Sequence, residues 1–106
     1  MVLEELYKLI QDRKDNGQEG SYTKYLLDKG TNKILKKIGE ECSEVLIAAK
    51  DNNKDEIVSE ICDLVYHLLV LMVDKEVEID NVREELIKRN SKINNFKGER
   101  KANENI

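Results

Sequence analysis

Two clusters of carboxylate residues occur in neighbouring segments of the chain. The first contains Glu40, Glu41 and Glu44, and the second contains Glu60 and Asp63. Burying several carboxylates together costs free energy or forces some of them to take up a proton. A hard divalent cation such as Mg²⁺ removes this conflict, because it takes carboxylate oxygens as ligands and keeps positions for water and phosphate oxygens. The clusters therefore predict either a magnesium site or, as for most acidic runs, a hydrated helix surface.

The segments that carry these clusters are predicted to form an antiparallel pair of helices. Apolar residues recur at helical spacing over residues 31–50 and again over residues 54–75. Asp51-Asn52-Asn53 separates the two segments as a turn, and helices joined by so short a turn lie side by side. Both clusters lie at similar distances from the turn, so we expect the five carboxylates to face each other.

Each long helix is predicted to bury one apolar stripe. At about 100° per residue, the first stripe contains Ile34, Ile38, Cys42, Val45 and Ala49. The second stripe contains Ile57, Ile61, Val65, Leu68 and Met72. Glu41 is the carboxylate nearest to the apolar edge. Because Cys42 and Cys62 fall on the inner stripes, we expect both to be buried and reduced rather than disulfide-bonded.

Shorter helices are expected on either side of this pair. The first covers residues 2–14, and Ser21 or Thr23 caps a short helix that closes at Gly30. Thr31 and Asp80 are the expected caps of the helix over residues 31–50 and of the last helix. The inner stripe of the last helix is expected to contain Val82, Leu86 and Ile93. We expect one domain over residues 1–96 and a flexible tail over residues 97–106.

The second half of the helix over residues 54–75 is apolar on every side, so it must be covered on every side. A chain of 106 residues has difficulty providing that cover alone. We therefore predict a homodimer whose interface merges with the core. The alternative is a central helix in a compact monomer.

Composition excludes several classes of function. The net charge of −4 argues against a nucleic-acid-binding surface, and the apolar runs are far shorter than a membrane span. The start of the chain lacks the pattern of a signal peptide, which predicts a cytoplasmic protein. His67 is the only histidine, which excludes a two-histidine zinc site and argues against a ferritin-like di-iron centre.

The acidic motif resembles that of a known superfamily. Glu40-Glu41-x-x-Glu44 followed by Glu60-x-x-Asp63 is similar to the signature of the all-α nucleoside-triphosphate pyrophosphohydrolases, which are called MazG-like. Three further stretches resemble the phosphoribosyl-ATP pyrophosphohydrolases of histidine biosynthesis. These are Gly20-Ser21-Tyr22-Thr23, Lys36-Lys37-Ile38-Gly39-Glu40-Glu41 and Asp63-Leu64-Val65-Tyr66-His67. The resemblance covers about residues 3–90.

This resemblance implies a fold, a reaction and a ligand set. The fold would be a MazG-like bundle of four to five helices in a homodimer. The reaction would be Mg²⁺-dependent hydrolysis of phosphoribosyl-ATP to phosphoribosyl-AMP and pyrophosphate in the cytosol. The magnesium ligands would be Glu41, Glu44, Glu60 and Asp63. Glu40 would be a further ligand, a partner of a ligand or the base that activates water, so Glu40 and Glu41 are the candidate catalytic carboxylates.

Substrate contacts are predicted among cationic and hydroxyl side chains. Lys37 lies on the same flank as Glu40 and is the first candidate to hold phosphate oxygens, and Arg13 is a second. Ser21, Tyr22 and Thr23 could bind a phosphate or ribose, although helix capping explains these residues equally well. His67 is a further candidate contact, and the alternative for it is a packed, hydrogen-bonded residue.

Two other functions remain open at this point. A house-cleaning hydrolase of (deoxy)nucleoside triphosphates would use the same metal chemistry and would differ only in its nucleoside pocket. A non-catalytic helical dimerisation module would carry the acids as surface residues. The module predicts no effect of Mg²⁺ on the melting temperature, whereas a metal site predicts stabilisation by the bound ion.

Overall fold

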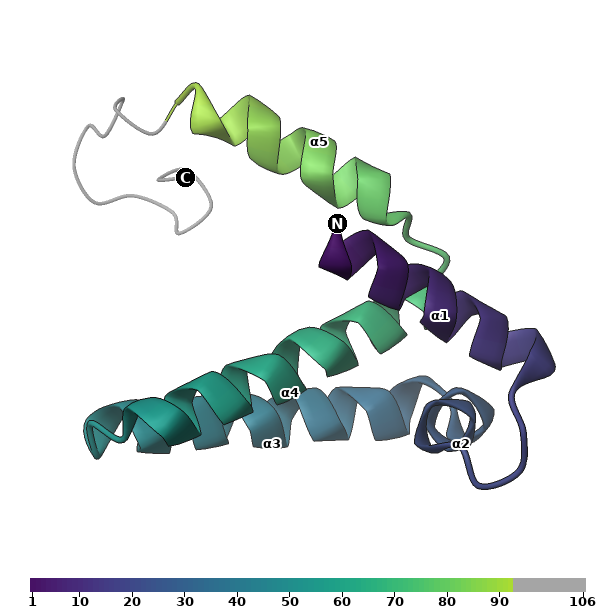
Figure 1. Cartoon of the computed structure of the whole chain (residues 1–106), viewed down its shortest axis with the longest axis horizontal. Coiled ribbons are helices and arrows are strands. Elements are labelled where there is room, and N and C mark those ends of the chain that lie inside the picture. Colours follow the sequence, from purple (N-terminus) through teal and green to yellow (C-terminus); the bar gives the residue numbers. More distant parts are fainter. Residues whose placement is uncertain (93–106) are drawn as a thin grey trace.

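The structure is a computed structural model that describes residues 1–92, and these residues form five α-helices and no β-strand (Figure 1). In chain order the helices are α1 (Val2–Asn16), α2 (Tyr22–Lys29), α3 (Thr31–Lys50), α4 (Lys54–Asp74) and α5 (Ile79–Asn90). The predicted all-α class is confirmed. The expected tail over residues 97–106 lies outside the described residues. No described helix combines the length and the apolar character that crossing a bilayer requires.

Helices α3 and α4 form the antiparallel hairpin predicted from the sequence, and they lie side by side along most of their length (Figure 1). At the turn, Asn52 adopts a positive φ of 55°, and the Asn53 side chain accepts a hydrogen bond of 3.1 Å from the Glu56 backbone N–H. At the open end, the Thr31 hydroxyl donates to the Asp74 carboxylate at 2.6 Å. Polar contacts at both ends therefore fix the register of the hairpin.

Helices α1 and α2 pack on the hairpin at the open end, away from the turn (Figure 1). The buried apolar residues gather there: Tyr7, Ile10, Leu26, Ile34, Leu69, Val70 and Val73. The Tyr7 hydroxyl also donates to the Val77 carbonyl at 2.7 Å, which ties α1 to the segment after α4. The core thus anchors α2 at the open end of the hairpin.

Two of the predicted helix caps are wrong. Ser21 caps α2 as expected, because its side chain accepts from the Lys24 backbone N–H. Gly30 ends α2 with a φ of 94°, a conformation that glycine adopts without steric cost. Thr31 is the first residue of α3 rather than its cap, since its hydroxyl is engaged by Asp74. Asp80 lies within the first turn of α5, which has no side-chain cap.

The predicted inner stripes are wrong at several positions. Cys42 and Cys62 are both exposed free thiols. The buried positions of α3 are Ile34, Glu41 and Ala48, and its half-buried apolar positions are Ile38 and Val45. In chain order these five positions are separated alternately by four and three residues. The face that meets α4 therefore passes through Glu41 instead of Cys42 and through Ala48 instead of Ala49. On α4, Ile61 and Leu68 are exposed for the same reason, because the buried face is rotated away from them.

Helix α5 extends away from the other helices and buries none of its residues (Figure 1). Its expected inner residues Val82 and Leu86 are both exposed, and only Ile79, at the start of α5, is partly buried against the core among its described apolar residues. Ile93, the third of them, lies outside the described residues. Beyond Ile79, the apolar residues Val82, Leu86 and Ile87 of α5 are therefore left exposed.

Candidate functional site

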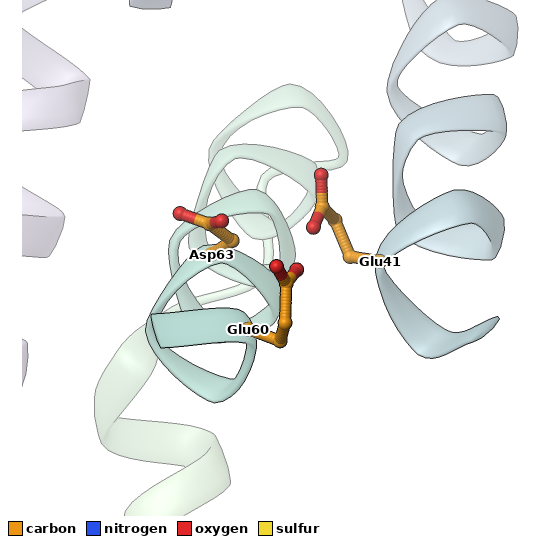
Figure 2. Close-up of side chains that lie close together, drawn as sticks. All are labelled: Glu41, Glu60 and Asp63. Atoms are coloured by element: carbon orange, nitrogen blue, oxygen red, sulfur yellow. The ribbon is translucent and has the colours of Figure 1, made fainter. Parts of the chain in front are cut away.

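Three carboxylates from two helices meet between α3 and α4. One oxygen from each of Glu41, Glu60 and Asp63 lies within 4.8 Å of the others. Figure 2 shows Glu41 reaching from α3 toward Glu60 and Asp63 on α4. Glu60 and Asp63 share a face because they are three residues apart on a helix. Glu41 meets them because it occupies the inner face of α3. We call these three residues together with Glu44 the acidic cluster.

Two oxygens of this cluster are buried without any polar partner. Glu41 is only 6% exposed, and neither its Oε2 nor the Oε2 of Glu60 has a hydrogen-bond partner or contact with solvent. A buried charged oxygen without a partner is costly. A hard divalent cation would satisfy several such oxygens at once. The donor set and its burial therefore fit a divalent cation such as Mg²⁺.

The carboxylates of the cluster perturb each other's ionisation. Loss of hydration raises the pKa of Glu41, and the neighbouring charges of Glu44 and Asp63 raise it further, while the adjacent Glu60 carboxyl group opposes this increase. Hydrogen bonding to Glu44, followed by loss of hydration, raises the pKa of Glu60 to about 7. Glu44 is exposed but close enough to both residues to act on them. Without a cation, the cluster therefore holds a proton near neutral pH.

The other candidate residues on α3 lie beside this cluster. Glu40 is exposed, and its Oε2 lies 3.4 Å from Nζ of Lys37. The Lys37 charge also lowers the pKa of the Tyr22 hydroxyl, partly opposing its increase by desolvation. Lys37 thus lies between Glu40, with which its ammonium group is paired, and Tyr22 at the start of α2.

The candidate residues on α2 contact α4 through hydroxyl groups. The Tyr22 hydroxyl lies 2.9 Å from Nε2 of His67. The Thr23 hydroxyl is hydrogen-bonded to the Tyr66 hydroxyl, and Thr23 is buried. Tyr66 was not singled out as a site residue from the sequence, although it directly precedes His67. The only signal available was its place in the stretch that resembles the phosphoribosyl-ATP pyrophosphohydrolases.

Arg13 and Ser21 belong to a different part of the surface. Nη1 of Arg13 lies 3.4 Å from the Ser21 hydroxyl oxygen. Both residues line an open cleft of about 480 Å³ at the loop between α1 and α2, and no carboxylate of the acidic cluster lines this cleft. The structure therefore brings Lys37 and Tyr22 to the acidic cluster, whereas Arg13 and Ser21 line the cleft at the α1–α2 loop. The Arg13 charge nevertheless reaches the Tyr66 hydroxyl, whose pKa it lowers against the larger increase caused by desolvation.

Comparison with known proteins shows which family the sequence resembles. The sequence model described as phosphoribosyl-ATP pyrophosphohydrolase matches residues 3–90. A phosphoribosyl-ATP pyrophosphatase of Clostridium novyi is 56% identical over 105 residues, which cover 99% of this chain and 96% of that protein. One from Bacillus cytotoxicus is 52% identical over 87% of this chain and 86% of its own length.

A longer relative contains a similar segment. The histidine biosynthesis bifunctional protein HisIE of Caldanaerobacter subterraneus is 53% identical over 91 residues, which cover 86% of this chain but only 44% of that protein. The match over nearly the whole chain includes both helices that carry the acidic cluster. This chain therefore belongs to the phosphoribosyl-ATP pyrophosphohydrolase family.

Proposed function

We propose that this chain is a cytoplasmic, Mg²⁺-dependent enzyme of histidine biosynthesis that hydrolyses phosphoribosyl-ATP to phosphoribosyl-AMP and pyrophosphate. The observation that carries the proposal is the meeting of Glu41, Glu60 and Asp63 with two buried oxygens that lack partners. The identity of the substrate is inferred from the family to which the chain belongs. The exposed free thiols of Cys42 and Cys62 support a reducing compartment.

Four residues are proposed to hold the cation: Glu41, Glu44, Glu60 and Asp63. The short distances between their oxygens support Glu41, Glu60 and Asp63. Glu44 is supported by its hydrogen bonding with Glu60, which raises the pKa of Glu60. A bound Mg²⁺ would offset charge on the phosphate oxygens and lower the pKa of a bound water. The carboxylates alone would repel a polyphosphate, so the ligand set must be neutralised before the substrate can bind.

The remaining candidates act on the substrate or on water. Glu40 is exposed at the edge of the cluster, where its carboxylate could accept a proton from the attacking water. Lys37 supplies a positive charge beside it for the phosphate oxygens. Substrate binding is also proposed for Arg13, Ser21 and Thr23, with less support. Ser21 already caps a helix, Thr23 is buried against Tyr66, and Arg13 lines the cleft at the α1–α2 loop.

A substrate panel separates this proposal from its alternative, a house-cleaning hydrolase of nucleoside triphosphates with the same metal chemistry. With Mg²⁺ present, we expect kcat/KM for phosphoribosyl-ATP to exceed that for dCTP, dUTP or ATP by roughly a hundredfold or more, the order of discrimination that added specific contacts provide. The rate of pyrophosphate release is measured with each of the four substrates. Equal or greater turnover of dCTP or dUTP would favour the house-cleaning hydrolase.

We also propose that the chain works as a homodimer. Apolar side chains are strongly exposed on the outer faces of the hairpin and on α5: Leu35, Leu46, Ile47, Val58, Ile61, Leu86 and Ile87. Exposed apolar residues gathered in this way mark interaction surfaces. A second copy would cover them and give α5 a surface to pack on.

Sedimentation tests the dimer. At tens of micromolar we expect the wild-type chain to sediment with twice the mass of one copy. Ile61→Asp should shift it toward one copy, because a charge in an apolar interface is costly. Val2→Asp is the matched control, since Val2 is 75% exposed at the end of α1. A wild-type chain that sediments as a single copy would contradict the dimer.

A further inference from the structure

His67 is a buried residue whose two ring nitrogens are both hydrogen-bonded. It is only 5% exposed. Its Nδ1 lies 2.7 Å from the Asp63 backbone carbonyl oxygen, which can only accept a hydrogen bond. Nδ1 therefore carries the proton, and in this tautomer Nε2 is an acceptor. It follows that the Tyr22 hydroxyl donates to Nε2 across 2.9 Å.

This hydrogen bond fixes a tyrosine ring that is also held by its neighbours. The Tyr22 ring stacks on Tyr25 with a centroid distance of 6.2 Å and on Tyr66 with a centroid distance of 6.5 Å. It meets the His67 ring edge-on at 5.8 Å. Tyr22 nevertheless remains 46% exposed. The ring is thus held in one orientation while part of its surface stays open to a ligand.

The exposed tyrosine lies next to the acidic cluster. Its hydroxyl is within electrostatic reach of Lys37, Glu41 and Asp63. Asp63 also connects the two features directly, because its carboxylate belongs to the cluster and its backbone carbonyl holds His67. A nucleotide whose phosphates lie at the cluster would therefore place its nucleoside part within reach of this ring.

We propose that His67 is a positioning residue that holds the Tyr22 ring as a flat wall for the nucleoside part of the substrate. The proposal rests on the proposed function only in taking the acidic cluster as the place of the phosphates. His67 does not contact the substrate, since both of its nitrogens are engaged. Its effect is transmitted through Tyr22, whose aromatic surface suits a base or sugar face.

Two substitutions at His67 separate positioning from general packing. His67→Gln can place an amide oxygen where Nε2 was and so keep an acceptor for Tyr22. His67→Asn keeps only a donor near the Asp63 carbonyl. We expect His67→Asn and Tyr22→Phe to raise KM for phosphoribosyl-ATP about two- to tenfold, as the loss of one hydrogen bond predicts, with kcat changed less than about twofold. His67→Gln should recover most of the wild-type KM.

Two competitive inhibitors, AMP and tripolyphosphate, show which part of the substrate depends on His67. AMP carries a nucleoside and tripolyphosphate does not. The inhibition constant of AMP should rise with KM in His67→Asn, and that of tripolyphosphate should stay unchanged. The double variant His67→Asn with Tyr22→Phe should be no worse than either single variant, since the two act as one unit. An equal rise for both competitors, or effects that add, would overturn the proposal.

Measuring the affinity for AMP by calorimetry makes the test independent of catalytic turnover. If wild-type protein does not hydrolyse phosphoribosyl-ATP, the proposed function fails, but the order of AMP affinities among the variants still decides the role of His67. If His67→Asn does not fold, Tyr22→Phe and Tyr22→Ala carry the test, because Tyr22 is half-exposed. Unchanged AMP binding in Tyr22→Ala would then overturn the proposal.

Discussion

Changing Asp63 to Asn is expected to lower the rate of pyrophosphate release from phosphoribosyl-ATP by roughly a hundredfold to a thousandfold, the range found when a charge-stabilising group is removed from an active site. The substitution keeps the shape of the side chain and removes the charge that a cation requires. Asp63 is exposed, so the fold should tolerate the change. Glu44→Gln should have a comparable effect, because Glu44 lies close enough to Glu60 for hydrogen bonding between them to raise the pKa of Glu60.

The control for this prediction lies on the same helix. Asp55→Asn changes an exposed carboxylate in the first turn of α4, two turns before Asp63, and should leave turnover within about twofold because surface changes are usually nearly neutral. Circular dichroism and melting temperatures establish that each variant is folded. Turnover close to wild type in folded Asp63→Asn or Glu44→Gln would contradict the assignment of these residues to the ligand set.

Changing Glu41 to Gln is expected to stabilise the metal-free protein while abolishing its activity. Glu41 is buried beside other carboxylates, and loss of hydration followed by their charges raises its pKa. An amide has no charge to bury and can donate a hydrogen bond to Glu60 or Asp63. We expect the melting temperature at pH 8 in EDTA to rise by about 3–6 °C, the shift that a gain near 1 kcal/mol gives in a domain of this size.

The matched control is Glu84→Gln, which changes an exposed glutamate on α5 and should leave the melting temperature unchanged. A lower melting temperature for Glu41→Gln would contradict the view that the cluster is strained without a cation. Gaining stability by removing a functional group is typical of active sites, where function requires a destabilising arrangement.

The same strain gives the metal-free protein a dependence on pH. Glu60 has a pKa of about 7 in the folded chain against an ordinary value of 4.5. Between these values the folded state keeps a proton that the unfolded state has released, so the free energy of unfolding falls as pH rises. The contribution is fully present below pH 4.5 and is lost as pH rises through about 7.

Melting in EDTA at pH 5, 6, 7 and 8 measures this effect. The melting temperature of wild-type protein should fall across the series more steeply than that of Glu60→Gln, which cannot titrate at this position. Parallel curves for the two proteins would show that Glu60 does not hold the proton.

The sequence predicts the hairpin well because its signals are local. The two apolar periods and the Asp51-Asn52-Asn53 turn identify α3 and α4, and equal distances from the turn bring Glu41 opposite Glu60 and Asp63. Which residue of α3 faces inward is not a local property. Hydropathy favours Cys42 for that position, whereas the structure gives it to Glu41. A buried carboxylate breaks the hydrophobic pattern, as functional positions are expected to do.

Contacts between helices that are far apart in the sequence also could not be predicted from it. Tyr22 and His67 are 45 residues apart, and their hydrogen bond depends on how α1 and the core hold α2 against α4. Periodicity assigns each of these residues to a helix without indicating that they meet. The position of α5 is open for a similar reason, because periodicity places Val82 and Leu86 on one side of a helix without indicating what that side meets, and both are exposed in the structure.

The melting temperature of the wild-type protein at pH 8, measured in EDTA and then in increasing Mg²⁺, tests most directly whether the acidic cluster binds a divalent cation. Binding to the folded state alone stabilises it by an amount that grows with the logarithm of the ligand concentration. We expect the melting temperature to rise continuously with Mg²⁺ in wild-type protein and to rise much less in Asp63→Asn. A wild-type melting temperature that does not respond to Mg²⁺, or an equal response in Asp63→Asn, would contradict the account.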